Sequence, residues 1–197
     1  MKIPGTIQEI ARARNGMVST AEAVAAGCSR ASLSLWVRAG LLERVAHGVY
    51  LLPDAMEDEL AVMAARSKRI VFSHETALLL NGLAERTPVR HSATFPRNAV
   101  PRRELRDTIA CHYVSPGNLS LGKTVRTTSF GAPVPCYDAE RTVCDIVRSR
   151  NKMDEETFLS GLRLYAAWPA KDTALLDSYA RALGAENAVR RYMETLL

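Results

Sequence analysis

One segment of the sequence has the residue types and spacing of a nucleotide-binding loop. Residues 117–124 read Gly-Asn-Leu-Ser-Leu-Gly-Lys-Thr, which fits the G-x-x-x-x-G-K-T pattern. In a true phosphate loop a helix must follow directly, because its first backbone amides bind the phosphates. Residues 125–130 are instead β-branched and polar, and residues 131–133 read Gly-Ala-Pro. We therefore interpret the match as a turn sequence and predict no nucleotide cofactor.

No other set of reactive side chains has the spacing of a catalytic or metal site. The histidines and cysteines are scattered, without carboxylate or cysteine partners at ligand spacing. The one dense acidic group, Asp138, Glu140 and Asp145, is explained by helix capping. We predict that the protein is not an enzyme and has no catalytic residue, metal or cofactor. The alternative is a nucleotide-dependent or nuclease enzyme that its N-terminal region directs to DNA.

Positive charge is concentrated in two blocks of the chain. The net charge of +5 by itself only favours a polyanionic partner. Residues 1–53 hold six Lys/Arg against three Asp/Glu, and residues 87–136 hold seven against two. In the second block the arginines form either a solvated loop or a secondary set of phosphate contacts. These arginines are Arg97, Arg102, Arg103 and Arg106.

The first 53 residues have the pattern of a winged helix-turn-helix. Thr6 and Glu9 have the spacing of a capping box for a first helix. Ser19 or Thr20 is expected to cap a second helix, and Ser29 a third helix over residues 30–39. Two strand-like runs, residues 41–45 and 49–52, follow at once and predict a β-hairpin, the wing.

The third predicted helix has one apolar and one polar face. Leu33, Trp36 and Val37 lie at i, i+3 and i+4 and are expected to face the core. The opposite face is then free to enter the major groove of DNA, with the wing beside it. Arginine offers a planar fork to guanine or phosphate, and serine can donate or accept a hydrogen bond. The predicted DNA-binding residues are Arg30, Ser32, Ser34, Arg38, Arg44 and His47.

The remaining chain predicts an α+β fold. Residues 88–135 alternate with period two and indicate a small sheet, and helices are expected to begin after Asp138, Asp154 and Asp172. The predicted order is a winged helix-turn-helix DNA-binding domain (1–53), a connecting helix (54–69) and a C-terminal α+β domain (70–197), which holds a small sheet and a helical bundle. Without an apolar leader or a long apolar run, we expect a cytoplasmic protein with reduced cysteines and no membrane partner.

Several groups of residues together resemble a known family. Residues 39–45, Ala-Gly-Leu-Leu-Glu-Arg-Val, lead into residues 48–53, Gly-Val-Tyr-Leu-Leu-Pro. Phe-Ser-His-Glu at 72–75 and Glu-Arg-Thr at 140–142 follow, with a helical end through Tyr179 and Gly184. In this order they resemble the AbiEi antitoxins of bacterial type IV toxin–antitoxin systems, which are linked to abortive phage infection. The likeness covers nearly the whole chain, and residues 70–197 would form the antitoxin domain.

The resemblance implies a transcriptional autorepressor that binds inverted repeats in its own promoter and takes part in antiviral defence. Its partners would be double-stranded DNA and a cognate nucleotidyltransferase toxin, a functional rather than a stable physical partner. Such a chain is expected to be monomeric in solution and to assemble cooperatively on DNA. The same analogy makes Arg141 a structural residue that anchors a helix to the sheet. The exposed Leu35 and the sparse charge of the recognition helix depart from the family pattern.

Overall fold

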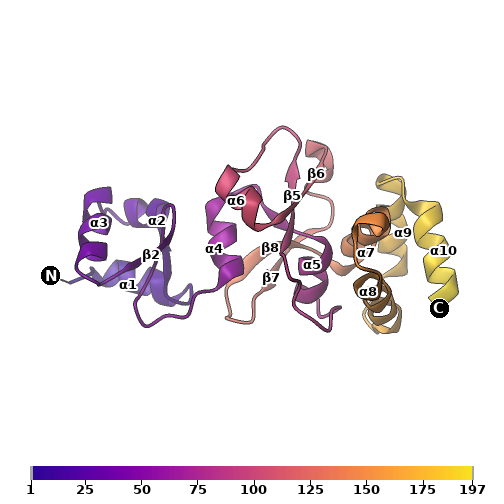
Figure 1. Cartoon of the computed structure of the whole chain (residues 1–197), viewed down its shortest axis with the longest axis horizontal. Helices are drawn as coiled ribbons and strands as arrows, with labels where there is room; N and C mark the ends of the chain where they lie inside the picture. Colours follow the sequence, from indigo (N-terminus) through magenta and orange to yellow (C-terminus); the bar gives the residue numbers. More distant parts are fainter. Residues whose placement is uncertain (1, 197) are drawn as a thin grey trace. The chain divides into compact units, whose positions relative to one another are not determined.

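The computed structural model describes residues 2–196 and divides into two compact units (Figure 1). Unit 1 comprises Met1–Lys68 with Thr127–Val134, and unit 2 comprises Arg69–Arg126 with Pro135–Leu197. Helices and two small sheets make up the chain, so the predicted mixed α+β class is confirmed.

Three short helices begin unit 1. They are α1 (Gly5–Arg12), α2 (Thr20–Ala25) and α3 (Arg30–Arg38). Ser19 and Ser29 cap α2 and α3 as predicted, because each hydroxyl accepts a hydrogen bond from the amide three residues later.

The predicted start of α1 is wrong. Thr6 lies inside the helix, and the residue before its first turn is Pro4, with no side-chain cap. The Pro4 carbonyl accepts hydrogen bonds from the amides of Ile7 and Gln8, at 3.1 and 3.2 Å. The helix therefore begins two residues earlier than the Thr6–Glu9 spacing suggested.

A three-stranded antiparallel sheet follows these helices. Its order is β1 (Met17–Ser19), β3 (Val49–Leu51), β2 (Glu43–Ala46), so β2 and β3 form a hairpin directly after α3. Gly48, at the hairpin tip, has a φ of +75°, which favours glycine. Its carbonyl accepts a 2.8 Å hydrogen bond from the amide of Thr20, which fixes the tip against α2.

The core of unit 1 lies between these helices and the hairpin. Ile7, Leu33, Trp36, Leu42 and Tyr50 form one buried cluster, so two of the three residues predicted for the core face of α3 are buried in it. The third, Val37, is partly buried against the same cluster.

Helix α4 (Glu59–Arg66) completes unit 1. Its N-cap, Asp58, is buried, and its carboxylate accepts hydrogen bonds from the Ala61 amide at 3.1 Å and the Thr128 hydroxyl at 2.5 Å. Ala132 is buried with Val62 and with residues of β3. Residues 127–134 therefore group with unit 1 although they are distant in the sequence.

Unit 2 contains a mixed five-stranded sheet. Its order is β6-β5-β4-β8-β7, with β5 parallel to β6 and β4 parallel to β8, while β4 and β5 are antiparallel. The strands are β4 (Val71–Phe72), β5 (Ser92–Pro96), β6 (Ala110–Val114), β7 (Lys123–Thr127) and β8 (Pro133–Tyr137). The small sheet expected over residues 88–135 is present, but it also includes β4.

One part of the predicted loop between these strands is helical. Arg103–Thr108 forms α6, a helix of six residues without a side-chain cap. The expectation of a solvated loop over residues 97–106 is therefore wrong from Arg103 onward, where the chain is helical. Leu105, the one buried residue of α6, holds this short turn against the unit.

Helix α5 and the helices of the C-terminal part of the chain pack around α7 (Figure 1). They are α5 (His74–Leu80), α7 (Ala139–Arg148), α8 (Glu155–Ala167), α9 (Thr173–Ala182) and α10 (Glu186–Leu196). Asp138, Asp154 and Asp172 cap α7, α8 and α9 at the predicted starts. Every residue of α7 except Arg148 is buried, so this helix is the centre of the bundle.

Candidate nucleic-acid interface

A groove of about 1080 Å³ opens on the surface of unit 1. Residues of α2, α3, the β2–β3 hairpin and α4 line it, so the helices and the hairpin present one continuous surface. Its lining includes four cationic side chains, Arg14, Arg30, Arg44 and Lys68, against one carboxylate, Glu22. A concave surface of this charge suits a phosphate backbone.

Four of the six predicted DNA-binding residues line this groove. They are Arg30 and Ser34 on α3 with Arg44 and His47 of the hairpin, and all four are exposed. The Ser34 hydroxyl donates a weak 3.3 Å hydrogen bond to the Arg30 carbonyl. At the hairpin, the guanidinium of Arg44 donates to Nδ1 of His47 at 3.1 Å, which holds the two side chains together at the rim.

The other two predicted residues lie outside the groove lining. Ser32 is half-buried, and its hydroxyl shares a 2.9 Å hydrogen bond with the capping hydroxyl of Ser29. Arg38 is exposed on the last turn of α3. Leu35, on the same side of the helix, is 51% exposed, and therefore α3 offers an apolar contact beside its cations.

Arg14 and Lys68 are groove residues that sequence reasoning missed. Arg14 forms an ion pair with Glu22, the capping-box glutamate of α2. Burial alone would raise the pKa of Glu22, but hydrogen bonds from Ser19 and the charge of Arg14 outweigh it and lower that pKa. Glu22 is thus ionised and neutralised, and Arg30, Arg44 and Lys68 supply the net positive charge of the groove.

The second predicted set of phosphate contacts does not form one cluster. Arg97 follows β5 and lines a cleft of unit 2 that does not include the other three arginines. Arg102 precedes α6, and Arg103 and Arg106 lie on it, all three exposed. Arg103 forms an ion pair with Asp107 in the same helix.

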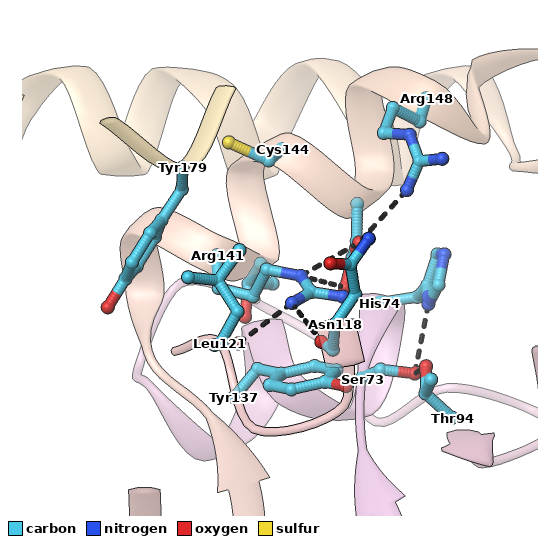
Figure 2. Close-up of polar contacts among 12 residues, drawn as sticks. Ser73, His74, Thr94, Asn118, Leu121, Tyr137, Arg141, Cys144, Arg148 and Tyr179 are labelled. Carbon is cyan, nitrogen blue, oxygen red and sulfur yellow. Dashed lines mark hydrogen bonds and ion pairs between the residues drawn. The ribbon is translucent and has the colours of Figure 1, made fainter. Parts of the chain in front are cut away.

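The segment that resembles a phosphate loop serves Arg141 instead. Figure 2 shows the Arg141 guanidinium between the loop of Asn118 and Leu121 and the ring of Tyr137. Its Nη1 donates to the carbonyls of Asn118 and Leu121, at 2.9 and 2.8 Å, and its Nε donates to Asp145 at 3.1 Å. These contacts tie α7 to the loop and to β8, which agrees with the structural role that the resemblance implied for Arg141.

The secondary structure after this loop is a strand. Lys123–Thr127 is β7, so the helix that a phosphate loop requires is replaced by an extended segment. Gly122 has a φ of +71°, and a Cβ there would lie 2.4 Å from the Cβ of Arg141. Close packing against Arg141 therefore explains the glycine at position 122, and no bound phosphate is needed to explain it.

Across residues 2–196 no three His, Cys, Asp or Glu side chains converge as a metal site. Burial raises the pKa of Cys136 and of Cys144 to about 12, so neither thiol ionises near neutral pH.

A helix-turn-helix-like region joined to a cationic groove is typical of DNA-binding transcriptional regulators. The comparison with protein families agrees with this class. Residues 6–53 match the family model described as "Transcriptional regulator, AbiEi antitoxin". The resemblance stated from the sequence is thereby confirmed over this segment, and the match supports a role as a regulator and antitoxin.

The whole chain is similar in fold to a solved structure. The crystal structure of RV2827C protein from Mycobacterium tuberculosis superimposes with a TM-score of 0.57 at 14% sequence identity. The similarity covers 100% of this chain and 83% of that chain. At this identity the likeness concerns the fold alone. A comparison with curated proteins found no match.

Among the residues that the structure describes, none of the helices combines the length and the apolar character needed to cross a bilayer.

Proposed function

We propose that the protein is a transcriptional autorepressor and the antitoxin of a type IV, AbiE-type toxin–antitoxin system. Residues 1–53 form a winged helix-turn-helix that binds inverted repeats in the promoter, with α3 in the major groove and the β2–β3 hairpin as the wing. The observation that carries the proposal is the cationic groove, whose lining combines α3 and the hairpin within the segment that matches the regulator family.

The side chains divide into two roles on DNA. Arg30 and Ser34 are exposed near the start of α3, where they reach base edges, and Ser32 adds a hydroxyl from the same turn. Arg38, Arg44 and His47 lie at the end of α3 and on the wing, where they contact phosphates or the minor groove. Arg102, Arg103 and Arg106 contribute secondary phosphate contacts.

The rest of the chain supplies the antitoxin activity. Residues 54–69 connect the DNA-binding domain to residues 70–197, which counteract a nucleotidyltransferase toxin in the cytoplasm without a stable complex. The chain is monomeric in solution and assembles cooperatively on adjacent half-sites. It has no enzymatic activity and no cofactor. Co-expression with the toxin encoded in the same operon tests this part: growth is restored by the intact chain and also by the Arg30→Ala/Arg44→Ala variant.

A titration of labelled DNA tests the repressor assignment. Fluorescence anisotropy compares the upstream promoter region with a duplex of the same length and scrambled sequence, across a range of salt concentrations. We expect Arg30→Ala to weaken promoter binding about tenfold and to reduce the preference for promoter over scrambled DNA. Arg44→Ala should weaken both duplexes alike and lower the salt slope by about one.

Arg12→Ala is the matched control for this titration. Arg12 is an exposed arginine of α1 that lines a different hollow of unit 1, with Lys2 and Gln8. Its loss removes the same charge from the unit without touching the groove, so a small and sequence-independent loss of affinity is expected. Equal affinity of the unaltered chain for promoter and scrambled DNA contradicts the repressor assignment.

A further inference from the structure

Unit 2 contains a cleft of about 370 Å³ that the DNA-binding proposal does not use. It lies where β5, β6, the start of α5 and the end of α7 meet, and its volume is in the range of small-ligand sites. His74 and His112 lie side by side in it, with their rings stacked at 3.5 Å between centroids and an interplanar angle of 14°.

Three cationic side chains from different segments converge on this cleft. Arg97 comes from the end of β5, Arg148 from the last turn of α7, and Lys152 from the turn after it. All three are exposed, and the structure pairs neither Arg97 nor Lys152 with a carboxylate in the described part of the chain. A position at a helix C-terminus accounts for Arg148 but not for Arg97, which lies in the turn after β5.

The one carboxylate of the cleft is already neutralised. Asp145 is buried, and both of its oxygens accept hydrogen bonds from Nε of Arg141, while Arg148 lies 4.0 Å away. The lining therefore has an unbalanced positive charge. Burial lowers the pKa of His74 well below its usual value. The positive charges around it lower that pKa further; they are those of His112, Arg141, Arg148 and Lys152.

A chain of buried hydrogen bonds orients a donor at the cleft. Thr94 donates to the hydroxyl of Ser73, which lies 2.9 Å from Nδ1 of His74 (Figure 2). Nε2 of His74 lies 2.9 Å from the hydroxyl of Ser149. With the Ser73 hydroxyl donating a hydrogen bond to Nδ1, the neutral ring carries its proton on Nε2 and donates to Ser149, because one nitrogen donates and the other accepts. The proton of Ser149 is then free to face the cleft.

The backbone at His74 is strained in support of this arrangement. Its φ is +49°, in the left-handed region, although it is not glycine and it is 4% exposed. Such strain persists where the surroundings demand it, and it concentrates at binding and catalytic sites.

We propose that this cleft binds the phosphate group of a small phosphorylated molecule, such as a nucleotide. Arg97, Arg148 and Lys152 supply the charge, and Ser149 supplies an oriented hydroxyl donor. The site is separate from the groove of unit 1, so it does not depend on the proposed DNA binding. Free phosphate compounds and a DNA backbone share this chemistry, and the volume of the cleft favours the free compound.

Calorimetry and NMR on the full chain test the proposal. Pyrophosphate is titrated first, then adenosine monophosphate, and ¹⁵N-resolved spectra locate the binding. We expect saturable binding that shifts the signals of Ser149 and His112. Arg97→Ala/Lys152→Ala should weaken it about tenfold or more, and Ser149→Ala, which keeps every charge, about threefold. Arg163→Ala is the control, because Arg163 is an exposed arginine on α8 outside this cleft.

Two kinds of outcome overturn the proposal. No saturable binding of either compound, or binding that Arg97→Ala/Lys152→Ala leaves unchanged, removes the site. A loss of DNA affinity in that double variant, without pyrophosphate binding by the unaltered chain, assigns these cations to a nucleic-acid backbone. Promoter binding that fails while pyrophosphate binding persists affects only the repressor assignment.

Discussion

The groove of unit 1 and the cleft of unit 2 hold their cations in different ways. In the groove, Arg30 and Arg44 are exposed, and the hydrogen bond from Arg44 to His47 is exposed as well. In unit 2 the polar groups behind the cleft are buried, with Arg141 at 0% and His74 at 4% exposure. Exposed cations contribute little to folding and are free to bind, whereas a buried cation depends on partners within the fold, which Arg141 has at Nε and Nη1 but not at Nη2. The comparison predicts that groove substitutions affect binding and that substitutions behind the cleft affect stability.

The largest effect is expected for Arg141→Ala. This change leaves the carboxylate of Asp145 buried without its partner and removes the donor from two loop carbonyls. Removing one member of a buried ion pair costs about 3–5 kcal/mol, which should appear in urea unfolding. Arg181→Ala is the control, because Arg181 forms an exposed pair with Asp177 that is worth about 0.5 kcal/mol or less. Similar losses in the two variants would refute the contrast.

The next effect is a dependence of stability on pH. Burial lowers the pKa of His74 well below its usual value, and burial also lowers that of His112. Below pH 6.5 the unfolded chain binds protons that the folded chain refuses, so stability is present above pH 6.5 and is lost on acidification. The slope is about 1.4 kcal/mol per pH unit for each imidazole fully within its window. Unit 1 differs, because the pKa of Glu22 is lowered. Its contribution to the free energy of unfolding is therefore lost only below pH 4.5.

Urea unfolding at pH 7.5, 6.5 and 5.5 measures this slope. Burial raises the pKa of Asp138 and of Asp145, which acts in the opposite direction, but it does so nearer the acid range of carboxyl groups. His74→Asn is the informative variant, since asparagine tolerates a positive φ and does not titrate. Its slope should be flatter than that of the unaltered chain. A slope that is equal in both would show that His74 does not contribute.

The smallest effect on stability is expected in the groove. Arg30→Ala and Arg44→Ala should each change the free energy of unfolding by about 0.5 kcal/mol or less, because both side chains are exposed. The same protein preparations serve the DNA titration, so stability and affinity are compared directly. A loss of several kcal/mol would mean that these arginines hold unit 1 together and would weaken their assignment to DNA.

Local signals explain what the sequence predicted of the fold. Ser19, Ser29 and Asp138 begin helices because their side chains accept hydrogen bonds from amides three residues away, a range that the sequence displays directly. Helix α6 was missed because it lacks such a cap and is held by the single buried side chain of Leu105. Thr6 had the capping spacing, but Pro4 begins the helix instead.

The sites depended on contacts that spacing does not reveal. The exposed face of α3 and the hairpin were predictable from periodicity, which is why Arg30, Ser34, Arg44 and His47 were named. Lys68, in the turn after α4, lines the same groove only once unit 1 has folded. His74 and His112 are 38 positions apart and appeared unrelated, yet the sheet register stacks their rings. Only the fold brings these groups together.

Gly122 has a consequence for motif searches. Arg141 leaves no room for a Cβ at the left-handed position 122, so packing alone accounts for the second glycine of the nucleotide-binding signature. Any relative that keeps the buried arginine is expected to keep the glycine as well. Where Gly117, Lys123 and Thr124 are also present, a scan for ATP-binding proteins would select such relatives although the second glycine of the match serves packing.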